Sequence, residues 1–129
     1  MPGAGDIATF DGTGNTPCTI NTTASVAGVD INSGYTNTIT QDAQLTVGTS
    51  NYDQADGTFT GGSQNIILNE HFVLSGGVFT ATSGNMTVDN NWTHTAGGTF
   101  NHNNGTVVTI GDGATWNFDS GSTVNSGNF

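Results

Sequence analysis

The tetrapeptide Gly57–Thr60 (GTFT) occurs again as Gly77–Thr80 (GVFT) and as Gly98–Asn101 (GTFN). The phenylalanines of the three copies lie 20 and then 21 residues apart along the chain. Self-similarity at a fixed period near 20 residues is typical of repeat architectures, in which each copy forms one supersecondary unit. These copies therefore indicate a repeat architecture.

Each copy carries further apolar positions behind its phenylalanine. An aliphatic pair comes first, with its members two residues apart, and a second aromatic residue follows. We assign the pairs as Ile66 with Leu68, Met86 with Val88 and Val108 with Ile110, and the second aromatics as Phe72, Trp92 and Trp116. Residues two apart share one face of a strand, so each copy predicts about three short strands separated by turns rich in Gly, Asn, Ser and Asp.

No single copy could bury its apolar face alone, but stacked copies bury one another's faces. The sequence therefore predicts an all-β parallel β-solenoid, or β-helix, of about five rungs with a repeat near 20 residues and three short strands per rung. A helical fold is disfavoured because apolar stripes of period 3.6 are absent and Gly, Thr and Asn are poor helix formers. The expected core stack contains Ile39, Phe59, Phe79, Phe100, Phe72, Trp92 and Trp116.

Weaker copies extend the pattern toward the start of the chain. Toward the start of the chain, the phenylalanine position is continued by Ile39 and Ile20. The aliphatic positions are continued by Leu45, Val47 and Val26, and the second aromatic position by Tyr52 and Ile31. We expect Gly111–Gly113 to form an inserted turn and Thr82 to lie in a turn.

Residues 1–129 are predicted to form a single solenoid domain, with an N-terminal cap over 1–17, rungs over 18–121 and the start of a further rung over 122–129. For a chain that stops within a rung we expect one of two explanations. Either it is a piece of a longer protein, or another molecule covers its end.

The charge balance excludes some partners. The 129 residues contain no Lys or Arg and ten acidic residues, which gives a formal charge of −10. Binding to phosphates requires cationic side chains, so we expect no nucleic-acid partner and no attraction to anionic membranes. No apolar run approaches the ~20 residues that span a bilayer, so membrane insertion is not expected. Cys18 is the only cysteine; we expect a buried thiol, with an intermolecular disulfide as the alternative.

Three segments, Pro2–Gly12, Gly76–Gly84 and Gly98–Val107, resemble the repeat regions of very large bacterial cell-surface proteins, the adhesin-like and autotransporter-passenger-like chains. The resemblance extends over nearly the whole sequence, and its motifs are structural. It implies secretion to the cell surface, a β-solenoid fold and a structural or adhesive role. It implies no catalytic residues.

The titratable residues show no established catalytic or zinc pattern. We expect His94 to point inward near Trp92, His71 to point outward and His102 to lie in an Asn-rich turn, without zinc-ligand spacing. A Gly-x-Ser-x-Gly elbow is absent. Calcium is the cofactor that the turns favour, because hard cations take oxygen ligands, although no EF-hand or Gly-Gly-x-Gly-x-Asp repeat is present. The candidate calcium ligands are Asp6, Asp11, Asp53, Asp56, Asp112 and Asp119.

Threonines alternate over Thr36–Thr40 in a pattern that resembles ice-binding faces, on which a flat threonine array orders water. In the sequence alignment threonine does not hold one column through all rungs, and strand propensity explains these residues equally well. The function expected from the whole sequence is a non-enzymatic, extracellular structural module of a bacterial surface or filament protein that associates with itself head to tail. The alternatives are a glycan- or surface-binding adhesin module and, less favoured, a small β-helix polysaccharide-active enzyme.

Overall fold

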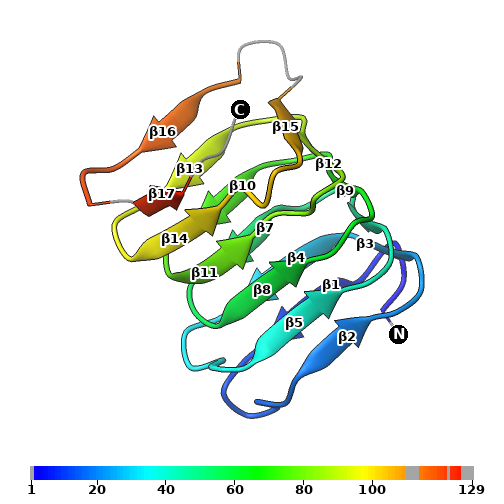
Figure 1. The fold of residues 1–129 in the computed structure, drawn as a ribbon. Coiled ribbons are helices and arrows are strands. Elements are labelled where there is room, and N and C mark those ends of the chain that lie inside the picture. The colour runs from blue at the N-terminus through cyan, green and yellow to red at the C-terminus, as the bar shows by residue number, and fades with distance from the viewer. Residues whose placement is uncertain (1, 110–113, 122, 126–129) are drawn as a thin grey trace.

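Three parallel sheets surround one core in the computed structural model, which describes residues 2–109, 114–121 and 123–125 (Figure 1). Sheet A contains β1 (Ile7–Phe10), β4 (Gly28–Ile31), β7 (Tyr52–Gln54), β10 (Phe72–Leu74), β13 (Trp92–His94) and β16 (Trp116–Phe118). Sheet B contains β2 (Cys18–Ile20), β5 (Thr38–Gln41), β8 (Thr58–Gly61), β11 (Gly77–Thr80), β14 (Gly98–Asn101) and β17 (Thr123–Asn125). Sheet C contains β3 (Ala24–Val26), β6 (Leu45–Val47), β9 (Ile66–Leu68), β12 (Asn85–Val88) and β15 (Thr106–Thr109).

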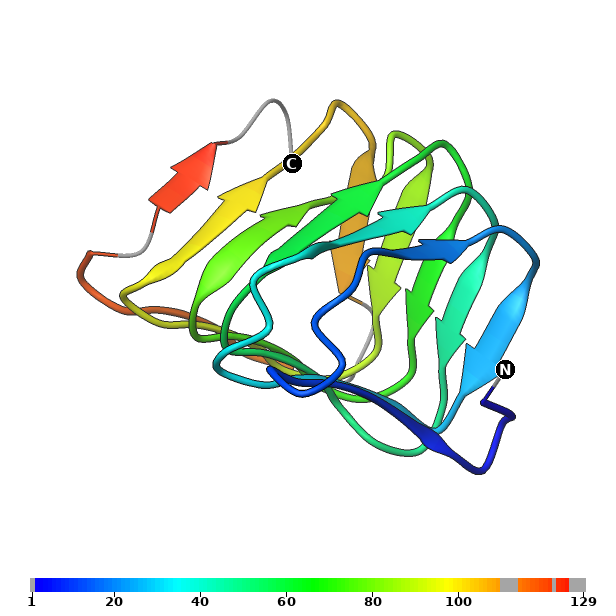
Figure 2. The same cartoon turned by 90° about the horizontal axis from the view of Figure 1, so that it is seen from below.

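The chain visits the sheets in turn, and each strand pairs in parallel with its equivalent strand one rung further on. Seen from below, the strands of the three sheets lie on different sides of a common interior (Figure 2). The arrangement is a β-solenoid of about five turns, with three strands per turn and a repeat near 21 residues. The predicted fold class is therefore confirmed. In the described part of the chain there is no helix that could cross a membrane.

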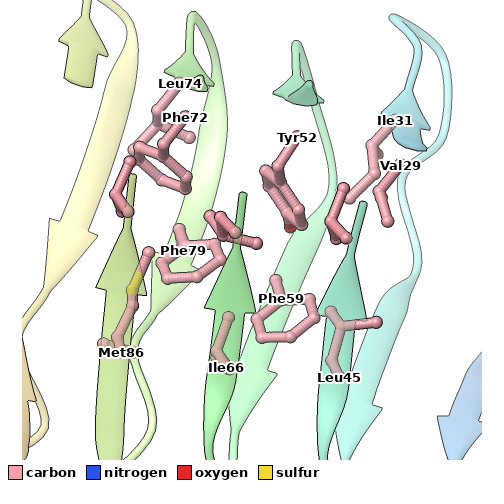
Figure 3. Close-up of a cluster of buried hydrophobic side chains, with 14 of the residues drawn as sticks. Val29, Ile31, Leu45, Tyr52, Phe59, Ile66, Phe72, Leu74, Phe79 and Met86 are labelled. Carbon is pink, nitrogen blue, oxygen red and sulfur yellow. The ribbon is translucent and has the colours of Figure 1, made fainter. Parts of the chain in front are cut away.

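The predicted phenylalanine column lies on the inner face of sheet B. Phe59 pairs with Phe79, and Phe79 pairs with Phe100, each one rung apart. All three side chains are fully buried, and Figure 3 shows Phe59 and Phe79 directed into the interior. At the start of the column the predicted register is wrong, because Cys18 and not Ile20 pairs with Ile39.

The aliphatic column on sheet C also requires a correction. Met86 pairs with Val107 and not with Val108, and the buried Val107 side chain is 7% exposed. Val107 follows its phenylalanine by seven residues, as Met86 and Ile66 do, so a constant offset gives the observed register. The Val-Val-Thr-Ile run fits an alternating pattern in either register, which explains the error. Ile110, like the proposed inserted turn 111–113, lies outside the described residues.

The second aromatic column lies on the inner face of sheet A. Tyr52, Phe72 and Trp92 follow one another in register and are fully buried. Tyr52 is preceded by Val29 and not by Ile31, which pairs with Gln54.

The column continues to Trp116, which belongs to the expected core stack but is not buried. Its ring stacks on Trp92 with centroids 5.3 Å apart, yet the residue is 38% exposed. Trp116 belongs to β16, the edge strand of sheet A, so the stack covers only one of its faces.

Polar side chains are buried where the sequence predicts turns. Thr82 is 1% exposed, and its hydroxyl lies 2.5 Å from the Gln64 carbonyl and accepts the Gly84 amide at 2.9 Å. His102 lies in the Asn-rich connection after β14, as expected, but it is only 2% exposed. Both residues therefore lie outside the strands, and their side chains continue the core beyond the strand ends.

Positive backbone φ angles occur at equivalent glycines of successive rungs. Gly57 has a φ of +67° and Gly77 a φ of +69°, each directly before a strand of sheet B or at its start. A Cβ atom at Gly77 would collide with the backbone of Asp56 and Gly57 one rung below. The repeated glycine is therefore required both by the turn and by the close approach of stacked rungs.

The segment 1–17, which we expected to act as a cap, contains strand β1. This strand pairs in parallel with β4 and is the first strand of sheet A. Its inward residues, Ala8 and Phe10, are partly buried against the core. The segment therefore also contributes to the first rung.

Candidate functional site

An apolar recess opens at the end of the solenoid formed by β1, β2 and β3. Its volume is about 120 Å³, and its walls include Ala8, Phe10 and Cys18. The recess reaches core residues of the next rungs, Ile39 and Phe59. The Cys18 thiol is free and half-buried here, so the expectation of a fully buried thiol is not met.

Aromatic residues are exposed at the opposite end. Trp116 and Phe118 on β16 are 38% and 39% exposed, and their rings lie 6.0 Å apart. The remaining large exposed hydrophobic residue of the described chain is Ile7 on β1. All three therefore lie on the two edge strands of sheet A. Trp116 and Phe118 continue inward columns beyond which no further rung is described, whereas Ile7 alternates with the inward Ala8 and Phe10 and faces outward.

The two ends present equivalent strand edges. Strands β1, β2 and β3 are the edge strands of sheets A, B and C at one end, and β16, β17 and β15 are the edge strands of the same sheets at the other. Edge strands carry backbone N–H and C=O groups that can pair with a further strand. Both ends therefore combine apolar core surface with pairing-competent backbone, and they are the candidate functional site.

The candidate calcium ligands are not brought together. Asp6 accepts the Gly3 amide at 2.9 Å, and Asp11 accepts the Thr13 amide at 2.8 Å within its own turn. Among the residues whose placement is described, no three His, Cys, Asp or Glu side chains are grouped closely enough to hold a metal ion. Asp119 follows β16, and Asp112 lies outside the described residues.

The two remaining candidates, Asp53 and Asp56, have opposite electrostatic environments. Asp53 is on the outer face of sheet A, where it pairs with Asp30 one rung below. Partial burial, followed by the nearby Asp30 carboxylate, raises the pKa of Asp53. Asp56 accepts the Gly34 amide at 3.0 Å and the Gly57 amide at 2.9 Å, and these bonds lower its pKa. Asp56 thus links its own turn to the preceding rung, which contains Gly34, by hydrogen bonds.

The histidines are held separately by neighbouring backbone groups. His94 is fully buried, as expected from its register with Leu74, and its Nε2 atom lies 2.8 Å from the Gly98 carbonyl. His71 is half-buried, and its Nδ1 atom accepts the Asn91 amide at 3.1 Å. The His94 contact links residues within one rung, and the His71 contact links two neighbouring rungs.

Sequence reasoning noted the threonines over Thr36–Thr40 but did not place threonines in columns on the outer face of sheet B. Threonines flank the inward residue on successive strands, as in Thr38-Ile39-Thr40 and Thr58-Phe59-Thr60. Thr36, which the sequence pattern grouped with them, lies in a loop and is bonded to Asn15. The signal was present in the repeat itself, since aligning the copies on their core residue also aligns the flanking threonines.

Comparison with protein-family models, with curated proteins and with solved structures gives no significant match in any of the three.

Proposed function

We propose that this chain is a non-enzymatic structural module of an extracellular bacterial surface or filament protein, and that its solenoid is extended by end-to-end stacking with a second copy. The observation that carries the proposal is the match between the two ends. One end holds an apolar recess, and the other exposes two aromatic side chains on the same sheet. The sequence resemblance to repeat regions of cell-surface proteins supports the extracellular setting.

Continuing the observed register across a junction places specific residues over one another. Ala8 occupies the first position of the column that ends in Trp116, and Phe10 occupies the first position of the column that ends in Phe118. In a head-to-tail stack, Trp116 of one copy would therefore lie over the small Ala8 of the next. The large indole would fill the recess, and the aromatic column would continue through the junction.

Such a contact joins two different surfaces of the same chain. Heterologous contacts of this kind give open filaments unless the rotation closes them into a ring. Charge opposes the contact, because every copy has a formal charge of −10 and no cationic side chain. Assembly should therefore be favoured by salt and by a pH near the isoelectric point of about 4.1.

The test is sedimentation and electron microscopy of the purified chain over a range of salt concentration and pH. We expect oligomers or fibres at high salt and near the isoelectric point. In the assembled state Cys18 should react more slowly with a thiol reagent, because the recess is filled. A chain that stays monomeric under all these conditions would show that the proposed junction does not form.

Matched variants test whether Trp116 forms the junction. Trp116→Ser should prevent assembly while leaving the melting temperature close to that of the wild type, because the indole is partly exposed. Thr93→Ser, on the outer face of β13 next to the edge strand β16, is the control and should assemble normally. Equal assembly of both variants would exclude the aromatic junction.

A further inference from the structure

The outer face of sheet B carries two parallel columns of threonines. Pairing register aligns the first column as Thr38, Thr58, Val78, Thr99 and Thr123. It aligns the second as Thr19, Thr40, Thr60, Thr80, Asn101 and Asn125. Eight of these eleven positions are threonine, and the strands that carry them run from β2 in blue to β17 in red in Figure 1. The face runs along the side of the solenoid and meets the two ends only at Thr19 on β2 and Thr123 on β17.

The columns form a regular two-dimensional array. Between rungs the repeat is close to the 4.8 Å that separates the stacked rings of Phe59 and Phe79 directly behind the face. Along each strand, positions two residues apart are separated by roughly 6.5–7 Å. The oxygen lattice of hexagonal ice repeats over similar distances in two perpendicular directions. An array of hydroxyls with this spacing can therefore hold water molecules near lattice positions.

Charge is excluded from this face. None of the ten acidic residues lies in a strand of sheet B, whereas the outer face of sheet A carries both Asp30 and Asp53. An ionised carboxylate orders water around itself and not in a lattice. The uncharged face of a chain with a formal charge of −10 is thus suited to an uncharged, ordered surface and not to a cation or a basic protein.

The side chains of the array are rigid and partly exposed. Threonine is β-branched, so its rotamers are restricted, and each side chain presents one methyl and one hydroxyl group. The Thr80 hydroxyl accepts a hydrogen bond from the side-chain Nδ2 of Asn101 at 3.2 Å. For Thr40 and Thr60, in the central rungs, the described residues provide no hydrogen-bond partner to the hydroxyl, which is therefore available to water. A preorganised array loses little conformational entropy when it binds.

We propose that the outer face of sheet B binds ice. The hydroxyls anchor water molecules at lattice spacing, and the methyl groups between them limit competing water orientations. A single exposed hydroxyl would contribute almost no binding free energy, because its hydrogen bond to ice only replaces a hydrogen bond to liquid water. The gain comes from the repetition of the same contact over five rungs on a rigid sheet.

The test is ice-affinity partition of the fluorescently labelled chain, together with observation of ice crystals grown slowly in its presence. We expect the wild type to enter the ice fraction and to shape the crystals. Exclusion of the wild type from ice would overturn the proposal. Binding to crystalline cellulose or chitin without binding to ice would overturn it too, and would identify the face as a polysaccharide-binding surface.

Matched substitutions test the face itself. Thr60→Tyr places a bulky ring in the centre of the array and should abolish ice binding. Thr93→Tyr makes the same change on the outer face of sheet A and should leave ice binding unchanged. Val78→Thr completes the first column and should increase retention in ice. Melting temperatures of the variants confirm folding, and loss of binding in both tyrosine variants would contradict the assignment to sheet B.

This test is independent of end-to-end assembly. A monomeric Trp116→Ser variant keeps the entire array, so it should still bind ice, although with fewer contacts than an assembled filament. Failure of assembly and failure of ice binding are therefore distinguishable in the same set of proteins.

Discussion

The rings of Phe59 and Phe79 lie almost parallel, 6° apart in orientation, with their centroids separated by 4.8 Å. This distance equals the spacing between hydrogen-bonded strands, so the Phe79 ring stacks on the Phe59 ring one rung below without shifting the backbone. Tyr52 packs edge-on against both rings, at 5.8 and 5.4 Å. The aromatic stack therefore couples neighbouring rungs and also joins sheet A to sheet B.

Removing one ring from the stack should strongly destabilise the solenoid. Phe79 is fully buried between Phe59 and Phe100, so Phe79→Ala should lower the free energy of unfolding by about 3–5 kcal/mol. Denaturant titration followed by tryptophan fluorescence measures the loss. Val73→Ala, at a half-buried outward position of β10, is the control and should cost much less. Equal losses would contradict the observed register.

The Thr82 hydroxyl is predicted to contribute to stability although the residue lies outside the strands. Thr82→Val keeps the side-chain shape but leaves the Gln64 carbonyl and the Gly84 amide without their buried partner. We expect a loss of about 1–3 kcal/mol in the free energy of unfolding. Thr93→Val on the outer face of sheet A should change stability by less than about 0.5 kcal/mol. A neutral Thr82→Val variant would show that water replaces these bonds.

The fold could be predicted from the sequence because the inward positions of each rung repeat at nearly constant spacing. Large apolar residues such as Phe59 and Trp92 mark these positions unambiguously. Inward polar residues outside the strands could not be found in this way, although the inward His94 on β13 could. Thr82 and His102 resemble turn residues in a hydrophobicity pattern, and their burial depends on groups one rung away in space. Likewise, Val107 and Val108 are equivalent in an alternating pattern, and only the offset from Phe100 distinguishes them.

The candidate surfaces were less predictable than the fold. The sequence suggested that turn aspartates bind a cation, but Asp11 accepts backbone amides of its own turn, and Asp56 accepts the Gly57 amide and the Gly34 amide one rung away. The threonine array was present in the repeat, yet Val78 and Asn101 interrupt its columns, so the pattern is incomplete along the chain. Parallel pairing brings the remaining threonines side by side, which requires the strand register and not only the composition.

A buried polar pair on β7 offers a test of cooperativity. The Tyr52 hydroxyl donates to Gln54 Oε1 at 3.0 Å, and Gln54 Nε2 donates to the Gly57 and Val78 carbonyls at 3.3 and 3.2 Å. Gln54→Leu should lower the free energy of unfolding by about 1–3 kcal/mol. The Tyr52 hydroxyl and the Gly57 and Val78 carbonyls would each lose the hydrogen bond to Gln54.

Adding Tyr52→Phe removes one of those unsatisfied groups. The double variant should therefore be more stable than the sum of the two single losses predicts, and a thermodynamic cycle measures the difference. If the stability losses of the two single variants add up to that of the double variant, the Tyr52 hydroxyl must find another partner when Gln54 is replaced.

Asp56 should stabilise the fold at neutral pH and lose this effect in acid. Two backbone amides, from Gly34 and Gly57, hold its pKa below the ordinary value of 3.8. A group with a lowered folded-state pKa contributes stability above its unfolded pKa, and the contribution is lost as the pH falls through the folded value. Asp56→Ala should therefore lower the melting temperature at pH 7, with a smaller difference well below pH 3.8.

Asp53 should show the opposite pH dependence. Burial and the neighbouring Asp30 carboxylate raise its pKa above 3.8, so the ionised side chain destabilises the folded state. Stability from this group is gained as the pH falls through the raised pKa, because the folded state then takes up a proton more readily than the unfolded state. Asp53→Asn should raise the melting temperature at pH 7 and have little effect below the unfolded pKa. Melting curves of the two variants over the same pH series provide matched controls. If Asp53→Asn lowered the melting temperature at neutral pH, the pairing of Asp30 with Asp53 would be favourable, as it would be if the two carboxylates shared a bound cation.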